Sequence, residues 1–473
     1  MKIILSTSPR ADSDLERGGL PFLGIGYIAS YLKKHNYDAE IKDPHNLNWK
    51  KEKTVNEILK SNPDIVGITT TTDNRLKAIE IIRELKKKKP SLIIVTGGPH
   101  FALTARNALK KVKEIDYVVK AEAEITMKEL ADAIKNKKDP TKIKGIFYRD
   151  NKGGILETQD REMEIDIDKF PLCWDLFDMD KYHRNIDGTN IRAIGVVSSR
   201  GCPNRCAYCV NAAFRKGLLR LRDPIKFVDE VEFLKNKYGF KGFDFWDDTL
   251  TISRKHIKTI CEEILKRELN IKWYARARVN TVDKELLQLM RKAGCIRISY
   301  GVESGSPKIL KIIRKNITPE QALKAAELSS EAGITTYLNF MVNLPYETWD
   351  DLRMTVDLMK RLRKIKNVYP AYGFTIIYPG TEMEEIAKRE GWLPKNFSWN
   401  EPYRSEKYKI AGIDPSLPYM EWPGAELERV KAFMARNLKS KNIISKGIKK
   451  ISKVRSLKEL KDLIKTGIRY FKK

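Results

Sequence analysis

The chain has 473 residues, of which 42% are hydrophobic and 32% charged, and its formal net charge at pH 7 is +28. This length is sufficient for two or three domains, each with its own hydrophobic core. No run of about 18 apolar residues occurs, which excludes a helix that crosses a bilayer, and Met1 to Arg10 lack the pattern of a signal peptide. Six cysteines in so long a chain do not form a disulfide scaffold. We therefore expect a protein of the reducing cytoplasm.

The first 141 residues alternate between apolar runs and helical spacing. We expect strands at residues 2–7, 38–41, 65–69, 92–96 and 117–119, and helices at residues 21–32, 54–59, 75–87, 102–109 and 126–134. Repeated strand–helix units of this kind predict a doubly wound parallel sheet, which binds ligands at the carboxyl ends of its strands.

Candidate ligand-binding residues follow the loop after the first strand or the ends of the later strands. They are Leu23, Gly24, Thr70, Thr71, Gly97, Gly98, Pro99, His100 and Glu124. Adjacent glycines allow a flat or phosphate-bearing ligand to approach the backbone closely. Taken alone, however, Gly97-Gly98 is a simple turn as often as it is a binding site.

Three of the six cysteines, Cys202, Cys206 and Cys209, share one loop after the apolar run 194–197. Three thiolates so close together indicate a metal. Structural zinc sites take four protein ligands, and no fourth Cys or His stands at the spacing of a Cys-x-x-Cys pair. Three cysteines and one open position suit an iron–sulfur cluster with one iron free for a small molecule. The alternative is three buried or incidental cysteines without a metal.

The spacing Cys-x3-Cys-x2-Cys, with Tyr208 before the last cysteine, resembles the motif of the radical S-adenosylmethionine (SAM) superfamily. The resemblance implies that Cys202, Cys206 and Cys209 hold a [4Fe–4S] cluster whose fourth iron binds SAM. It also implies an electron donor such as flavodoxin or ferredoxin. SAM would be cleaved to a 5′-deoxyadenosyl radical, which removes hydrogen from an unactivated carbon.

Further segments match this superfamily by their order along the chain. Asp247 and Asp248 end a strand expected at 242–246, where the resemblance implies contact with the SAM amino group. A helix cap is the alternative for Asp248. Arg278, at the end of a strand expected at 271–278, fits the position that meets the SAM carboxylate, and a solvated strand face is its alternative. Glu303 and Ser304 match the segment near the SAM ribose and methionine moieties.

Two departures from the superfamily follow a strand expected at 336–342. Asn343 and Tyr346 stand where relatives usually have glycine. Asparagine tolerates positive φ better than most residues, so we expect the turn at Asn343 to persist, and Tyr346 is a candidate to face the substrate. The last barrel strand is expected at residues 374–378.

Together with the cysteine motif, the N-terminal units look like the cobalamin-binding domain that precedes the radical SAM domain in one large subfamily. The residues at the strand ends would then contact cobalamin. The histidine of the usual motif follows the first strand, whereas His45 follows the second, and we expect it in a surface loop. Ala121 and Ala123 replace glycines, and their methyl groups would narrow the space for a corrin. A relic domain that binds no cobalamin is the alternative.

The sequence thus predicts an α/β protein with four parts. These are a Rossmann-like, doubly wound cobalamin domain at 1–141, a connector at 142–190, a radical SAM partial (βα)6 barrel at 191–395 and a helical C-terminal region at 396–473. No cysteine follows Cys295, which excludes a second cluster in the C-terminal region. Methylthiotransferases of tRNA need three further cysteines in their N-terminal domain, and residues 1–172 contain none.

The basic charge is concentrated at the C-terminus. From Arg436 to Lys473, fourteen Lys and Arg stand against Glu459 and Asp462, so twelve of the twenty-eight net charges lie there. Apolar residues recur among them at three- and four-residue spacing, which predicts basic amphipathic helices that bind the surface of an anionic membrane. A helical cap on the barrel is the alternative, and nucleic-acid binding is disfavoured because aromatic residues are scarce.

In its domain order the chain resembles anaerobic porphyrin ring cyclases and enzymes that modify hopanoid and tetraether lipids. The first hypothesis is an enzyme at the inner face of the membrane that methylates a lipid-like substrate through cobalamin, or closes a carbon–carbon bond in it. A soluble methyltransferase of a natural product or peptide is the second hypothesis. A non-catalytic cobalamin- or lipid-binding protein is the third.

Overall fold

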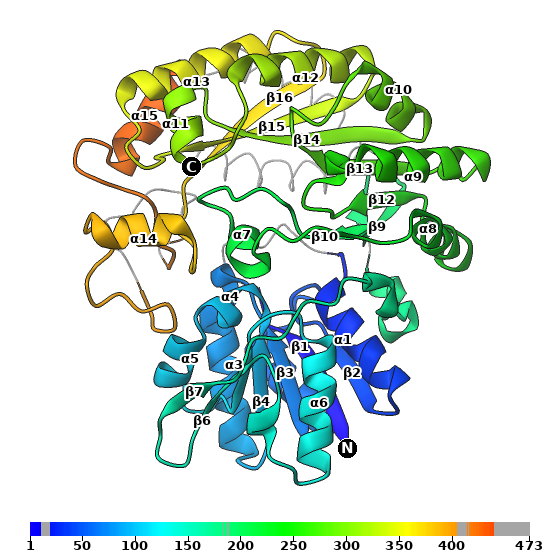
Figure 1. The fold of residues 1–473 in the computed structure, drawn as a ribbon, viewed down its shortest axis with the longest axis vertical. Helices are drawn as coiled ribbons and strands as arrows, with labels where there is room; N and C mark the ends of the chain where they lie inside the picture. Colours follow the sequence, from blue (N-terminus) through cyan, green and yellow to red (C-terminus); the bar gives the residue numbers. More distant parts are fainter. Residues whose placement is uncertain (11–18, 183, 187–188, 404–413, 415, 439–473) are drawn as a thin grey trace, which may run out of the picture.

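The computed structural model describes residues 1–10, 19–182, 184–186, 189–403, 414 and 416–438. Within these ranges the chain forms two seven-stranded sheets, each flanked by helices, and the N-terminal unit lies below the C-terminal one in Figure 1. No helix in the described ranges is long and apolar enough to cross a membrane. The prediction of an α/β fold built on two parallel sheets is confirmed.

The N-terminal sheet has the strand order β2-β1-β3-β4-β5-β6-β7, in which the first five strands are parallel. Its strands are β1 (Lys2–Thr7), β2 (Asp38–Lys42), β3 (Ile65–Thr69), β4 (Ile93–Gly97), β5 (Tyr117–Val119), β6 (Ile146–Arg149) and β7 (Ile155–Glu157). Its helices are α1 (Leu23–Lys34), α2 (Lys51–Lys60), α3 (Arg75–Lys88), α4 (Gly98–Leu103), α5 (Ala105–Lys111) and α6 (Glu124–Lys135). This order is doubly wound, and its ligand crevice lies at the carboxyl ends of the strands.

The antiparallel strands β6 and β7 extend this sheet with residues that the sequence placed in the connector. The remaining connector holds three short 3-10 turns at Ile167–Lys169, Trp174–Leu176 and Met179–Lys181. Trp174 is buried and its indole N–H donates to Glu230 of the C-terminal unit at 2.7 Å. Phe177 packs so tightly on α1 that a Cβ at Gly26 would lie 2.7 Å from its ring. The connector therefore joins α1 to the C-terminal unit through a buried aromatic layer.

The C-terminal sheet has the order β16-β15-β14-β13-β12-β9-β8 and curls into a half-barrel, whose six strands from β9 to β16 are parallel. Its strands are β8 (Arg184–Asn185), β9 (Arg192–Val196), β12 (Gly242–Phe245), β13 (Lys272–Ala277), β14 (Cys295–Glu303), β15 (Thr335–Val342) and β16 (Val368–Phe374). Its helices are α8 (Pro224–Tyr238), α9 (Arg254–Lys266), α10 (Lys284–Lys292), α11 (Pro307–Ile312), α12 (Pro319–Glu331), α13 (Trp349–Leu362) and α14 (Glu382–Arg389). A short ribbon of β10 (Ser199–Arg200) and β11 (Arg220–Leu221) and the helix α7 (Val210–Arg215) lie between the units (Figure 1).

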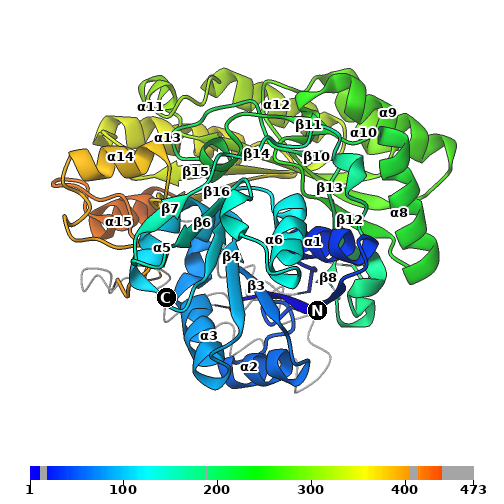
Figure 2. The same cartoon turned by 60° about the horizontal axis from the view of Figure 1, so that its bottom comes forward.

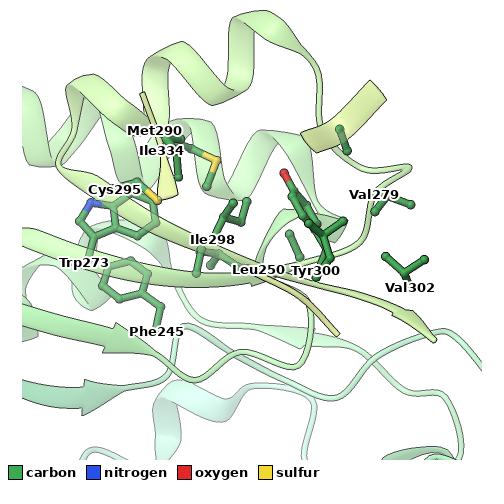
Figure 3. Close-up of a cluster of buried hydrophobic side chains, with 14 of the residues drawn as sticks. Phe245, Leu250, Trp273, Val279, Met290, Cys295, Ile298, Tyr300, Val302 and Ile334 are labelled. Carbon is green, nitrogen blue, oxygen red and sulfur yellow. The ribbon is translucent and has the colours of Figure 1, made fainter. Parts of the chain in front are cut away.

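The core of the half-barrel lies between the sheet and its outer helices (Figure 3). The rings of Phe245 and Trp273 are stacked with centroids 4.8 Å apart, and the Trp273 indole donates to the carbonyl of Ala293 at 2.8 Å. Cys295 lies in the same cluster and is fully buried, so it serves packing.

The last barrel strand is β16 at Val368–Phe374, and the expected strand at 374–378 is wrong. The strand contains Pro370, which cannot donate a backbone hydrogen bond and which made this stretch look unlike a strand. Proline is tolerated here because β16 lies at the edge of the sheet.

The C-terminal segment packs on both units (Figure 2). Helix α15 (Leu427–Leu438) lies against α13, where the rings of Trp349 and Phe433 are 5.4 Å apart. Arg75 of the N-terminal unit donates to the carbonyl of Trp399 at 2.8 Å. The first part of the C-terminal region is therefore a helical cap. Residues 439–473, with most of the expected basic helices, lie outside the described residues.

The turn after β15 keeps the expected positive φ, 62° at Asn343 and 60° at Tyr346. Glu347 accepts the backbone N–H of Asn343 at 2.8 Å and that of Leu344 at 3.3 Å. Burial raises the pKa of Glu347 to about 8. The Tyr346 hydroxyl donates to Glu390 at 2.7 Å on the surface, so this side chain holds α14.

The substitution Glu347→Gln tests this buried carboxyl. The folded chain holds a proton on Glu347 up to about pH 8 whereas the unfolded chain releases it near 4.5, so wild-type stability falls as pH rises between these values, by at most ~5 kcal/mol. We expect the variant to lose this fall in thermal unfolding curves between pH 5 and 8. Glu327→Gln, at an exposed position of α12, is the control. An unchanged pH slope in the Glu347 variant would contradict the assignment.

Candidate functional site

The three cysteines lie on the loop between β10 and α7, above the carboxyl end of β9. Gly201 has φ of 94°, and a Cβ there would lie 1.9 Å from the carbonyl oxygen of Leu218, so only glycine lets the two sides of the ribbon close. Cys209 caps the start of α7. Cys206 is buried, whereas Cys202 and Cys209 are partly exposed.

Polar groups surround the thiols. The Asn204 amide donates to Cys202 Sγ at 3.2 Å, and the Arg278 guanidinium approaches Cys206 Sγ at 3.8 Å. Burial raises the pKa of Cys209, and backbone N–H groups of Ala212 and Asn211 oppose this shift. Proteins adjust the reduction potential of an iron–sulfur cluster in part through hydrogen bonds to its sulfur atoms.

In the described ranges no three His, Cys, Asp or Glu side chains converge closely enough to hold one metal ion. A four-iron cluster takes one thiolate per iron, so its ligands surround a larger volume and need not meet at one point. The residues fit this cluster, with Cys202, Cys206 and Cys209 as its ligands.

The two aspartates after β12 have different surroundings. Asp247 is fully buried and accepts hydrogen bonds from the hydroxyls of Ser198, at 2.8 Å, and Ser199. It therefore braces the start of the cysteine loop. Asp248 is held by Asn211 of α7 and faces a cavity. Burial raises its pKa, and the nearby Arg215 opposes this effect.

Tyr208, Glu303 and Lys315 form a buried network beside the cysteines. The Tyr208 hydroxyl donates to Glu303 Oε1 at 2.9 Å, and the Lys315 ammonium donates to both partners at 2.8 Å. Burial, and then the charge of Glu303, raises the pKa of Tyr208 and keeps its hydroxyl protonated. Ser304 is buried beside this network and bonds to Thr355 of α13 at 3.2 Å.

Arg278 has donors directed to protein atoms: one to the carbonyl of Lys315 and one toward Asn280 at 3.4 Å, besides the contact with Cys206. It is buried next to Cys206, so the solvated strand face that was its alternative is wrong. These contacts leave it less free to receive a SAM carboxylate than the sequence suggested.

A cavity of about 910 Å³ lies between the two units. Of the predicted residues, its wall contains Leu23, Gly24, Gly97, Gly98, Pro99, Glu124 and Asp248. The opposite wall comes from the half-barrel side and includes Ser199, Arg200, Asn211, Phe214, Arg215, Trp246 and Arg276. The cavity thus joins the strand ends of the N-terminal sheet to the cysteine loop.

The cavity also fits a large, flat ligand. Its volume is at the upper end of the range for small-molecule sites, about 300–1,000 Å³. A Cβ at Gly24 would meet no atom within 4 Å, so space remains beside the backbone of α1. Ala121 and Ala123 lie on the wall without closing the cavity, and His45, expected in a surface loop, lies on the wall as well.

Of the residues predicted at the strand ends of the N-terminal sheet, three do not line this cavity. His100 is fully buried and lies between Thr72, at 3.2 Å, and Asn400, at 3.3 Å. Burial lowers its pKa to about 3, so the ring stays neutral. Thr70 bonds to Ser8 at 2.9 Å, and Thr71 accepts from Asn74 at 3.1 Å. Their contacts hold the strand ends and the C-terminal cap.

Two glutamates of the N-terminal unit pair with arginines of the cysteine ribbon. Arg220 binds Glu122 with two hydrogen bonds of 2.6 and 2.8 Å, and Arg200 binds Glu124 at 2.8 Å. Burial alone would raise the pKa of Glu122, but Arg220 and Arg200 outweigh it and hold this pKa below its ordinary value. Of these four residues only Glu124 was predicted from the sequence, because the others are marked only by partners far along the chain.

Comparison with known proteins agrees with this arrangement. The family model "Radical SAM superfamily" matches residues 196–359, and "B12 binding domain" matches residues 17–131. An uncharacterized methyltransferase of Pyrococcus horikoshii is 30% identical over 449 residues, which cover 94% of each chain. Anaerobic magnesium-protoporphyrin IX monomethyl ester cyclase of Rubrivivax gelatinosus is 32% identical over 349 residues, which cover 72% of this chain and 62% of the cyclase.

Two solved structures have the same fold. The cobalamin-dependent SAM radical enzyme OxsB, with aqua-cobalamin and SAM bound, superposes with a TM-score of 0.74 at 19% identity, over 99% of this chain and 71% of OxsB. The radical SAM methyltransferase TsrM of Kitasatospora setae, with cobalamin and a [4Fe–4S] cluster, has a TM-score of 0.67 at 20% identity, over 82% of this chain and 75% of TsrM.

Glu122→Gln tests the ion pairs between the units. The substitution leaves the buried Arg220 without its carboxylate, and we expect a loss of about 3–5 kcal/mol in the free energy of unfolding. Chemical denaturation measures this loss, with Glu80→Gln at an exposed position of α3 as the control. Equal stability of the two variants would show that the pairs do not hold the units together.

Proposed function

The chain belongs to the family of radical SAM enzymes that carry an N-terminal B12-binding domain, and on this premise we propose that it is a cobalamin-dependent methyltransferase. The support for methylation is the methyltransferase of P. horikoshii, which is similar over almost the whole of both chains. The observation that carries the proposal is the cavity whose walls come from the strand ends on one side and from Asp248 and the cysteine ribbon on the other.

Each group of residues has a part in this proposal. Cys202, Cys206 and Cys209 hold the [4Fe–4S] cluster, Asp248 receives the amino group of SAM, and Glu303 receives its ribose. Leu23, Gly24, Gly97, Gly98 and Pro99 form the floor on which cobalamin lies, with Glu124 beside it. When bound, the cluster and SAM would supply a 5′-deoxyadenosyl radical, and cobalamin would supply a methyl group. The enclosing walls keep bulk water away from the radical, and a flavodoxin or ferredoxin supplies electrons.

Ring or carbon–carbon bond formation is the second candidate. Its support is the 32% identity with the magnesium-protoporphyrin ester cyclase. The two candidates share the hydrogen-abstraction step and differ in what the substrate radical meets next. The substrate remains a proposal in both cases, because this chain spans 62% of the cyclase.

We also propose that the substrate is hydrophobic and is reached at the inner surface of the membrane. The support is the basic amphipathic pattern of residues 439–473, which adds lysine and arginine charges suited to anionic lipids. A soluble natural product or peptide is the alternative substrate.

Replacing each cluster cysteine by serine tests the enzymatic proposal. We expect anaerobically reconstituted wild type to convert SAM to 5′-deoxyadenosine, and Cys202→Ser, Cys206→Ser and Cys209→Ser to lose this activity by about a thousandfold or more. Chromatography of 5′-deoxyadenosine, with iron analysis of each protein, gives the result. Cys261→Ser, at a buried cysteine of α9 away from the loop, is the matched control. Wild type that holds four irons and forms no 5′-deoxyadenosine would exclude the proposal.

A chain cut after Leu438 tests the membrane proposal. The cut keeps α15, because Val430 and Met434 of this helix are fully buried. A cut before α15 would remove these side chains from the core. We expect full-length protein to sediment with vesicles of anionic lipid at low salt, and the shortened chain to remain in solution while it keeps its thermal stability. If both chains bound the vesicles equally, or if neither chain bound them, the proposed membrane-binding role of residues 439–473 would be wrong.

A further inference from the structure

Lys315 lies in a strained loop directly after α11. Both of its neighbours are in the left-handed region, with φ of 52° at Arg314 and at Asn316. Residues other than glycine adopt this conformation rarely, and it persists where the surrounding structure fixes it. The backbone is thus held in a costly conformation that directs the Lys315 side chain inward, where it is 7% exposed.

The ammonium of Lys315 has two partners on different elements. It lies 2.8 Å from Oε1 of Glu303, at the end of β14, and 2.8 Å from the hydroxyl of Tyr208, between two of the cysteines. Tyr208 in turn donates to the same Oε1 at 2.9 Å. Every hydrogen bond that the described residues give this carboxylate therefore ends on Oε1, and Oε2 is left for a ligand.

The surrounding backbone makes room for this arrangement. Glu303 itself has φ of 71° and follows an irregularity in the pairing of β14 with β15. A Cβ at Gly301 would lie 2.4 Å from Glu303 Oε1 and 2.8 Å from Lys315 Nζ. Any side chain at this position would displace these two charged groups from where they lie.

The same loop is tied to the cysteines through its backbone. The carbonyl of Ile313 accepts the N–H of Ala207 at 3.0 Å, and the carbonyl of Lys315 accepts from Arg278, which also approaches Cys206. The loop that carries Lys315 is therefore fixed relative to the cluster ligands on both sides.

We propose that Lys315 is a positioning residue for SAM: it holds Oε1 of Glu303 so that Oε2 points toward the ribose hydroxyls of SAM. This inference rests on the proposed function, in which Glu303 receives the ribose. No motif in the sequence marks Lys315, and it acts on the ligand through Glu303 and Tyr208. The Glu303 side chain has three rotatable bonds. Because two donors already hold one of its carboxylate oxygens, SAM does not have to restrict the rotation of this side chain when it binds.

A purely structural ion pair would behave differently from a positioning residue. Removing one partner of a buried pair destabilises the fold and, here, would loosen the cysteine loop with it. A structural role therefore changes iron content and thermal stability, whereas a positioning role changes SAM affinity at full iron content. The double substitution Lys315→Met with Glu303→Gln removes both charges and leaves no uncompensated one.

The experiment uses the full chain with its reconstituted cluster and measures the dissociation constant of SAM by equilibrium dialysis. The variants are Lys315→Met, Glu303→Gln, the double variant and, as control, Lys311→Met, which removes the same charge at an exposed position of α11. We expect Lys315→Met to weaken SAM binding about tenfold at wild-type iron content, and Lys311→Met to bind SAM as wild type does. We expect the double variant to bind no more than about twofold more weakly than Glu303→Gln, because both changes remove one interaction.

The inference would be overturned if the two single effects multiplied in the double variant, or if Lys315→Met bound SAM as the control does. Loss of iron in Lys315→Met together with unchanged affinity per cluster would assign the pair a structural role and also overturn it. Failure of the proposed function is recognised separately, because wild type itself would then hold the cluster and bind no SAM. The electron paramagnetic resonance spectrum of the reduced cluster, with and without SAM, gives a second readout of the same difference.

Discussion

The arrangement of this molecule depends on two buried ion pairs, Glu122 with Arg220 and Glu124 with Arg200. They join the end of β5 to the ribbon that starts the cysteine loop. The Arg200 guanidinium also lies 4.5 Å from the ring centroid of Tyr27 on α1, a cation–π contact that pairs the same two units. Buried pairs of this kind contribute little net stability, but removing one partner leaves an uncompensated buried charge and is strongly destabilising.

This constraint determines where the chemistry takes place. Arg200 directly precedes Gly201 and Cys202, so the pair with Glu124 fixes the first cluster ligand relative to the N-terminal strand ends. Asp247 braces the same loop from β12, and Asp248 next to it faces the cavity. The connector and the C-terminal cap join the two units at other places, through Trp174 and Arg75. The cavity is thus bounded by contacts between distant parts of the sequence.

Much of this architecture was predictable because it is encoded locally. The period of apolar residues gave both parallel sheets, and the spacing of Cys202, Cys206 and Cys209 located the cluster loop. The last strand was misplaced because Pro370 interrupts the pattern, and only its position at the sheet edge makes it acceptable. Lys315 and Glu122 were not found, since their roles depend on partners 12 and 98 residues away. His100 looked like a ligand at a strand end, but its ring is enclosed by the C-terminal cap.

The surroundings of the cysteines combine strain with charge. Left-handed backbone at Glu303 and on both sides of Lys315 is retained in the immediate neighbourhood of Tyr208 and Arg278. Strain of this kind concentrates where a protein must present groups in one geometry. The half-barrel therefore supplies a rigid upper wall, and the N-terminal sheet supplies the floor.

The central claim is that one cavity brings the cluster and cobalamin together. The most direct test is the electron paramagnetic resonance spectrum of the anaerobic protein that contains both a reduced cluster and cob(II)alamin. We predict that the two signals are broadened or split by magnetic interaction, compared with samples that contain only one of the paramagnetic centres. A spectrum that is the simple sum of the two separate signals, in protein with full iron and cobalt content, would contradict the account.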